Sequence, residues 1–344
     1  MKKIILFSAI LSLSLFLTAC PQKQEKSNSS SATSTASSSS STVETKKPKV
    51  VATIGMIADV ARTIAGECID ITAIMGPGID PHLYTASAND VRLFQHADMI
   101  FYSGYHLEGK LAEILEKMSE SRPVIAVAEN AIPESQIINS FQGKTAPDPH
   151  VWMDVSQWAA TVDVISKELS KLAPDCKTKF EENAISYKKE LSALHEWIKE
   201  SIQTIPKNQR ILVTAHDAFE YYGRAYTIRV DGIQGISTAS EAGLADIKKV
   251  VELVVSHKVP ALFVETSINP RTIKAVQAAV QDRGFDVAIG NQLFSDAMGT
   301  NGTAGGTYIG MLYSNTKNIS DALGGKAPKL PTELSAWEEK WQIN

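Results

Sequence analysis

The 344-residue chain has few cysteines and no excess of positive charge. Its three cysteines are Cys20, Cys68 and Cys176, and none lies in the spacing of a cysteine-based metal motif. The chain carries 34 basic and 38 acidic residues, whereas nucleic-acid-binding proteins are typically basic. We therefore expect no nucleic-acid partner. The chain also lacks the H-E-x-x-H motif of zinc proteases.

The N-terminal apolar run is too short to span a bilayer. Residues 4–17 are apolar except for serines, and they follow Lys2 and Lys3. A run of this length after positive charges is typical of a signal peptide. The next residues, Thr18-Ala19-Cys20, resemble the end of a bacterial lipobox. We predict a lipoprotein signal peptide over residues 1–19 and lipidation of Cys20, with an ordinary signal and a free Cys20 thiol as the alternative.

A segment with almost nothing to bury follows the signal peptide. Residues 27–42 are nearly all serine, threonine and alanine, a composition that cannot offset the entropy lost on ordering. We predict a flexible tether over residues 20–48, which anchors the protein to the extracytoplasmic side of a bacterial cell membrane through lipidated Cys20. This compartment permits a disulfide between Cys68 and Cys176, but one widely separated pair does not establish it.

Strand and helix patterns alternate along the rest of the chain. Short apolar runs such as 50–54 and 99–102 predict buried strands, and the segments between them have helical periodicity. The alternation resumes at 211–214, so we predict an α/β fold with parallel sheets covered by helices on both faces. Further strands are predicted over 69–75, 124–127, 261–264 and 287–289, and helices over 57–65, 87–96, 111–118, 218–225, 245–257 and 270–282.

One long helix is predicted between the two alternating halves. Residues 178–203 carry a single apolar stripe at steps of three and four, and a helix of this length spans roughly 40 Å. We therefore predict an N-terminal lobe over 49–174, a stiff linking helix over 175–204, and a C-terminal lobe over 205–344.

Three histidines and one aspartate are the candidate metal ligands: His82, His150, His216 and Asp296. A proline precedes each of the first two and fixes the backbone there. Three imidazoles and one carboxylate form a tetrahedral site suited to a divalent transition metal. Because these residues are far apart in the sequence, the site must form between large substructures, at the carboxyl ends of strands.

The candidate ligands lie within a series of short motifs that runs through residues 49–344. Any one of these motifs is a weak signal, whereas the series is specific. The motifs are Asp80-Pro81-His82, Asp148-Pro149-His150, Thr214-Ala215-His216-Asp217-Ala218-Phe219, Gly235-Ile236-Ser237-Thr238, Val264-Glu265-Thr266-Ser267, Phe294-Ser295-Asp296-Ala297-Met298-Gly299 and Gly306-Thr307-Tyr308-Ile309-Gly310.

Through these motifs the chain resembles the TroA-like metal-binding solute-binding lipoproteins of zinc and manganese ABC transporters, cluster A-I. The resemblance implies two α/β lobes joined by a long rigid helix, with the metal in the cleft between them. It implies a high-affinity receptor that delivers the ion to the membrane permease of an ABC-type importer. The family's four ligand positions fall on His82, His150, His216 and Asp296.

Glu265 is the most notable acidic residue outside this set. It ends an apolar strand, so it can orient a ligand imidazole or, alternatively, cap the helix that begins near Pro270. The remaining histidines, His96, His106, His195 and His257, are expected to be structural, with His106 the closest to the cleft.

The donor set and the surrounding sequence point to different metals. Three imidazoles with one carboxylate suit Zn²⁺, and some manganese- or iron-handling relatives carry glutamate at the position of His216. Many zinc-specialised relatives carry a histidine-rich loop between the first two ligands, and residues 128–147 contain no histidine. We expect Zn²⁺ first, Mn²⁺ as the close alternative, and Fe²⁺ as a minor one.

Other functions fit the sequence less well. A zinc hydrolase needs an open coordination position, and four protein ligands leave little room for one. A surface adhesin remains an alternative for an exposed lipoprotein, although no motif specifies its partner. Gly104–Leu111 approaches a phosphate-binding loop, but Leu111 stands where serine or threonine would bind magnesium. We expect a monomeric binding protein rather than an enzyme.

Overall fold

The computed structural model describes residues 46–139 and 146–343. The predicted signal peptide, Cys20 and all but the end of the predicted tether lie outside these residues. Among the described helices, none is both long and apolar enough to cross a membrane.

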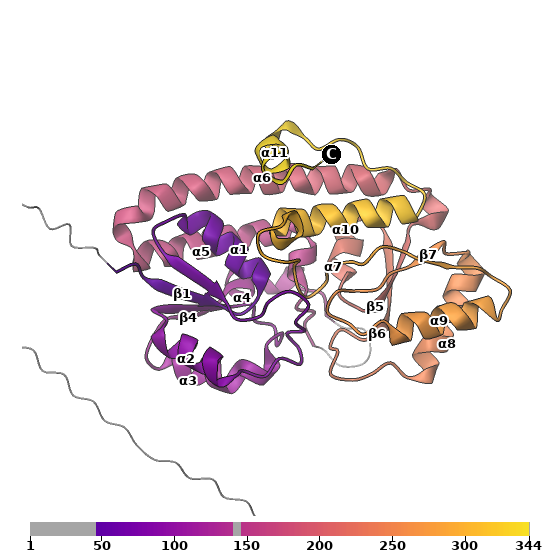
Figure 1. The fold of residues 1–344 in the computed structure, drawn as a ribbon, viewed down its shortest axis with the longest axis horizontal. Coiled ribbons are helices and arrows are strands. Elements are labelled where there is room, and N and C mark those ends of the chain that lie inside the picture. Colours follow the sequence, from indigo (N-terminus) through magenta and orange to yellow (C-terminus); the bar gives the residue numbers. More distant parts are fainter. Residues whose placement is uncertain (1–45, 140–145, 344) are drawn as a thin grey trace, which may run out of the picture. The chain divides into compact units, whose positions relative to one another are not determined.

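The N-terminal half is built on a parallel four-stranded sheet with the order β2-β1-β3-β4. Helices α1 and α5 lie on one face of the sheet, and α2 and α3 lie on the other (Figure 1). The apolar residues of the central strands β1 and β3 are buried between these layers, apart from Tyr102 at the end of β3, whereas those of the outer strands are mostly only partly covered. The elements are β1 (Lys49–Ala52), α1 (Gly55–Ala65), β2 (Asp70–Ala73), α2 (Ala88–His96), β3 (Met99–Tyr102), α3 (Ala112–Ser119), β4 (Val124–Ala126), α4 (Val127–Ala131) and α5 (Val155–Leu172).

The C-terminal half contains two parallel strand pairs, β5 with β6 and β7 with β8. A bridge between Thr214 and Phe263 connects the pairs. A smaller apolar core lies under this half, where α8 and α9 pack on the strands. The elements are β5 (Ile211–His216), α7 (Glu220–Tyr226), β6 (Arg229–Gln234), α8 (Leu244–His257), β7 (Ala261–Leu262), α9 (Arg271–Gln281), β8 (Ala288–Ile289), α10 (Tyr308–Ala322) and α11 (Ser335–Trp341).

Strand β6 was not predicted because Asp231 and Gly232 interrupt its apolar pattern. The structure explains the glycine. A Cβ atom at Gly232 would lie 2.6 Å from the backbone nitrogen of Asp217, so only glycine allows the two segments to approach so closely.

The predicted long helix is α6 (Lys177–Gln203), and it runs along both halves (Figure 1). Its apolar stripe is buried against α1, α5 and α10. One apolar core is shared by the two halves, because Phe219 and Tyr308 belong to the same buried cluster as Trp152. Helix α10 of the C-terminal half therefore packs against α6 and shares the core of the N-terminal half.

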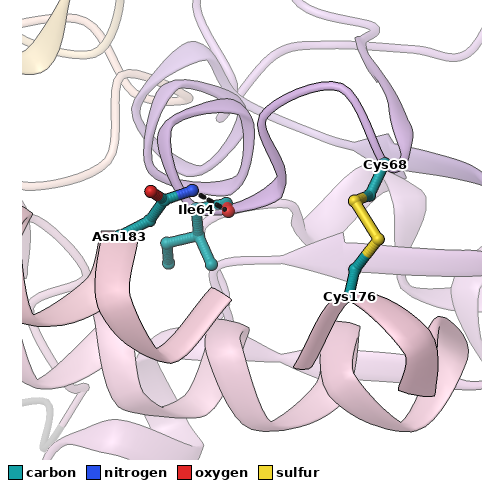
Figure 2. Close-up of a disulfide and its surroundings, with 4 residues drawn as sticks. All are labelled: Ile64, Cys68, Cys176 and Asn183. Atoms are coloured by element: carbon teal, nitrogen blue, oxygen red, sulfur yellow. Dashed lines mark hydrogen bonds between the residues drawn. A yellow bond between two sulfur atoms is a disulfide. The ribbon is translucent and has the colours of Figure 1, made fainter. Parts of the chain in front are cut away.

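A disulfide joins Cys68 to Cys176, the pairing that the sequence alone left open. It connects the turn after α1 to the start of α6 (Figure 2). Close by, the Asn183 side chain donates a hydrogen bond of 2.9 Å to the carbonyl of Ile64. The first turns of α6 are thus fixed to the N-terminal half by a covalent bond and a hydrogen bond.

Candidate metal site

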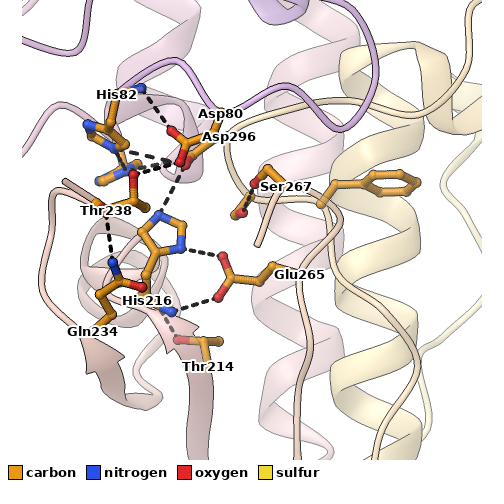
Figure 3. Close-up of polar contacts among 12 residues, drawn as sticks. Asp80, His82, Thr214, His216, Gln234, Thr238, Glu265, Ser267 and Asp296 are labelled. Atoms are coloured by element: carbon orange, nitrogen blue, oxygen red, sulfur yellow. Dashed lines mark hydrogen bonds and ion pairs between the residues drawn. The ribbon is translucent and has the colours of Figure 1, made fainter. Parts of the chain in front are cut away.

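The structure brings His82, His150, His216 and Asp296 together at one point between the two halves. Figure 3 shows three of them, His82, His216 and Asp296, facing one another. One donor atom from each residue lies within 4.8 Å of the others. His82 lies in the loop between β2 and α2, and His150 directly precedes a 3₁₀ turn. His216 is the last residue of β5, and Asp296 follows the bridge of Leu293 to Glu265. Both halves therefore contribute two candidate ligands.

The spacing of the donor atoms fits one small cation. Nε2 of His150 lies 3.3 Å from Nε2 of His82 and 3.2 Å from Oδ1 of Asp296. Oδ2 of Asp296 lies 3.2 Å from Nε2 of His216 and 3.9 Å from Nε2 of His82. Donors at about 2.0–2.2 Å from a tetrahedrally bound ion are roughly 3.3 Å apart. The four groups can therefore enclose a single ion.

Hydrogen bonding gives a second indication that these groups suit a cation. All four residues are buried, with exposed fractions of 8% or less. Nε2 of His216 and both carboxylate oxygens of Asp296 lie close together, but none of them makes a hydrogen bond of acceptable geometry with a described residue. Buried polar atoms in proteins are normally satisfied, and a bound metal ion would satisfy these.

The first two candidate ligands, His82 and His150, are held by the same kind of local turn. The Oδ1 atom of Asp80 accepts a hydrogen bond of 2.9 Å from the His82 backbone N–H, and Oδ1 of Asp148 accepts one of 3.0 Å from that of His150. Each Asp-Pro-His motif therefore forms an Asx turn with the intervening proline fixing its backbone. In the second copy, Oδ1 of Asp148 also lies 2.7 Å from Nδ1 of His150, so it orients the imidazole as well.

Glu265 orients the third imidazole. Its Oε2 lies 2.5 Å from Nδ1 of His216, and its Oε1 accepts a hydrogen bond of 2.9 Å from the backbone N–H of the same residue. Glu265 does not cap α9 in the structure, since both of its carboxylate oxygens lie on His216 and the first N–H of α9 donates to Asn269. A carboxylate on Nδ1 leaves Nε2 facing Asp296 and the other ligands.

The segment that carries Asp296 is held by residues that sequence reasoning missed. The Asn315 side chain, buried in α10, accepts a hydrogen bond from the Phe294 N–H and donates one to its carbonyl. The indole of Trp152 donates to the Ser295 carbonyl at 3.0 Å. These contacts join positions far apart in the sequence, and no local motif signals them.

The electrostatics of the site favour positive charge. Burial alone would lower the pKa of His150, but Asp148 and Asp296 raise it to about 9. Burial opposes charge on His216 as well, yet Glu265 and Asp296 hold its pKa well above the usual value. Burial and the neighbouring imidazoles lower the pKa of His82 to about 4, although Asp296 opposes this shift. The site therefore retains protons on His150 and His216 but not on His82, and a bound cation would take the place of those two protons.

The other histidines lie elsewhere, as expected. His195 lies 3.2 Å from the Tyr226 hydroxyl, and His257 caps its own helix through the Leu253 carbonyl. His106 is exposed and lies outside the ligand cluster. In the loop that resembles a phosphate-binding motif, the carboxylate of Glu108 accepts hydrogen bonds from the N–H groups of Ser103 and Gly104, which a phosphate would need.

A comparison with known proteins identifies the family of this chain. A family model described as zinc-uptake complex component A, periplasmic, matches residues 50–322. The chain belongs to this family. The manganese-binding lipoprotein MntA of Bacillus subtilis (strain 168) is 45% identical over 275 residues, 80% of this chain and 89% of the relative. The zinc-binding protein TroA of Treponema pallidum (strain Nichols) is 45% identical over 277 residues, with the same coverage.

The fold has a close counterpart among solved structures. The periplasmic zinc binding protein TroA from Treponema pallidum matches with a TM-score of 0.78 at 45% identity, over 81% of this chain and 99% of that one. This match confirms the predicted fold class, two α/β lobes with parallel sheets and a long helix. The family that the sequence motifs indicated is likewise confirmed.

Proposed function

We propose that the protein is an extracytoplasmic receptor that binds one divalent transition metal ion and delivers it to an ABC-type importer. The observation that carries the proposal is the convergence of His82, His150, His216 and Asp296, two from each half, with donor atoms 3.2–3.9 Å apart. Membership of a family of metal-uptake receptors supports the same function.

Zn²⁺ is the proposed ion, with Mn²⁺ as the close alternative and Fe²⁺ as a minor one. Three imidazoles and one carboxylate suit zinc in softness and geometry. The two relatives at 45% identity are named for different metals, zinc for TroA and manganese for MntA. Affinity alone does not decide between them, because zinc binds more tightly than manganese at most such sites.

The site is proposed to bind rather than to catalyse. Catalytic zinc sites keep a coordination position for water, whereas four protein donors close the shell. Glu265, the nearest candidate base, is engaged by Nδ1 and the backbone N–H of His216. A surface adhesin is the alternative function, but no feature of the described residues specifies a partner for it.

Anchoring and partners complete the proposal. Lipidation of Cys20 after removal of residues 1–19 would attach the chain to the bilayer, with residues 20–48 as the tether. The lobes span residues 49–174 and 205–344, with residues 175–204 linking them. The permease is the protein partner, and the receptor acts as a monomer on the extracytoplasmic face.

The proposal is tested by metal content and thermal stability. Protein purified from its native host should hold about one zinc or manganese ion per chain. Adding either ion to metal-free protein should raise the Tm, because an ion at a thousand times its Kd stabilises the folded state by about 4 kcal/mol. Calcium and magnesium prefer more oxygen donors and should have little effect. A larger shift with calcium than with zinc or manganese would contradict the site.

A further inference from the structure

The four candidate ligands differ in how firmly the protein holds them between the lobes. The segment around His150 has several hydrogen bonds to the C-terminal half. The Tyr221 hydroxyl donates to the Asp148 carbonyl at 2.9 Å, and the Tyr308 hydroxyl donates to the Trp152 carbonyl at 2.7 Å. With the Trp152 indole on Ser295, these bonds attach His150 to the opposite lobe without help from a metal.

The loop that carries His82 has one such attachment. This loop spans residues 76–87. Within the described chain, its one hydrogen bond to the C-terminal half is accepted by Oδ2 of Asp80 from the Thr238 hydroxyl, at 2.6 Å (Figure 3). His82 is also the most exposed ligand, at 8%, against 0% for His150 and His216. His82 is therefore the candidate ligand least shielded from solvent.

Thr238 belongs to a surface loop but is itself buried. Of residues 235–243, Thr238 alone is buried. The amide of Gln234 donates to the carbonyls of Thr238 at 2.9 Å and of Ser240 at 2.7 Å, which fixes the loop at the end of β6. Gln234 is in turn the β6 partner of His216 in the sheet. The loop is therefore built on the strand beside one ligand and reaches across to the turn that holds another.

The aspartates of the two Asp-Pro-His turns differ in the contact they make besides the hydrogen bond to the histidine N–H. Asp148 turns back to Nδ1 of its own histidine, whereas Asp80 places its second oxygen on Thr238 in the other lobe. The same local motif thus orients an imidazole in one copy and connects two lobes in the other.

We infer that the Thr238–Asp80 hydrogen bond is a latch that holds the His82 loop closed over the bound ion and sets the rate at which the ion is released. This inference rests on the proposed function as a metal receptor. Thr238 and Gln234 are positioning residues, since neither lies among the metal donors. Opening the latch frees the loop of His82 while the hydrogen bonds that join the segments of His150 and Asp296 to the opposite lobe remain.

The test is a measurement of zinc association and dissociation rates on the full mature chain, by stopped-flow with a chelating dye. Thr238→Val, which removes the hydroxyl and keeps the shape, should raise the dissociation rate about tenfold or more, because a hydrogen bond to a carboxylate is lost. The association rate should stay the same or rise. Thr238→Ser keeps the hydroxyl and should restore the slow release.

Two further variants separate the latch from general damage to the loop. Gln234→Leu releases the loop from β6 and should also speed release. Ser240→Ala is the matched control, because its side chain is exposed and has no hydrogen bond in the described structure. Adding Asp80→Asn to Thr238→Val should give less than the product of the two single effects, since the amide only weakens the bond that the valine removes.

The outcomes distinguish the latch from the receptor function. A wild-type release rate in Thr238→Val, with His150→Ala still abolishing tight binding, would overturn the latch and leave the receptor intact. Equal acceleration by Thr238→Ser and Thr238→Val would overturn it as well, because the hydroxyl would then be irrelevant. Failure of the wild-type chain to bind zinc or manganese would overturn the receptor function and the latch with it.

Discussion

Oε2 of Glu265 lies 2.5 Å from Nδ1 of His216, and the other carboxylate oxygen holds the backbone N–H of the same histidine. One side chain thus fixes both the ring and the main chain of a candidate ligand. Both residues are fully buried, so water cannot replace either contact.

This contact predicts the effect of Glu265→Gln. The amide keeps the size of the side chain but loses the charge that favours a metal-binding imidazole, so zinc affinity should fall by about 10–100-fold. Titration calorimetry with competing chelators would measure the change. Glu241→Gln, in the exposed loop before α8, is the control and should bind as the wild type does. Unchanged affinity in Glu265→Gln would remove its orienting role.

Alanine substitution should separate ligand histidines from structural ones. His150→Ala and His216→Ala each remove one of four donors and should weaken zinc binding by several orders of magnitude. His195→Ala is the matched control, because His195 contacts the Tyr226 hydroxyl rather than the ligand cluster. Equal loss of affinity in His195→Ala would show that the ligand set is assigned wrongly.

The disulfide should stabilise the fold without tuning the metal site. It closes a long loop, with a sequence separation of 108, and in the chain-entropy model such a bond contributes about 4–5 kcal/mol. Cys68→Ser combined with Cys176→Ser should therefore lower the Tm clearly in thermal unfolding. The bond joins segments that hold none of the four candidate ligands, so zinc affinity should change little. A large loss of affinity in the double variant would show that the α6 attachment positions the site.

Asp59 should make stability depend on pH. This carboxylate of α1 accepts a hydrogen bond from the Tyr308 N–H at the start of α10. Burial raises its pKa to about 6, although the Tyr308 N–H and Arg62 oppose the shift. Folding therefore favours the protonated form, so Asp59 costs stability at pH 8, and this cost disappears as the pH falls through about 6 towards 4.

Asp59→Asn isolates this contribution. The amide can still accept from Tyr308 but does not titrate. The free energy of unfolding of wild type, relative to the variant, should increase by on the order of 2 kcal/mol between pH 8 and pH 4. Denaturant unfolding of the metal-free forms at several pH values would measure it. Parallel profiles for the two proteins would contradict the prediction.

The sequence by itself determined the fold class and brought forward the four candidate ligands. Alternating apolar strands and amphipathic helices are local patterns, so α6 was predicted within a residue of its observed start, and β3 with its observed bounds. The Asp-Pro-His turns are also local, because the aspartate bonds the backbone two residues on. Such features depend on neighbours in the chain and can be inferred from it.

Tertiary structure decided every contact between distant segments. The pairing of Cys68 with Cys176, the choice of Glu265 to orient His216 rather than cap a helix, and the hydrogen bond from Thr238 to Asp80 all join residues far apart in the chain. Each depends on which sheet edges and loops come together when the lobes pack around α6. A glutamate at a strand end or a threonine in a surface loop has several possible partners, and only packing leaves one within hydrogen-bonding distance.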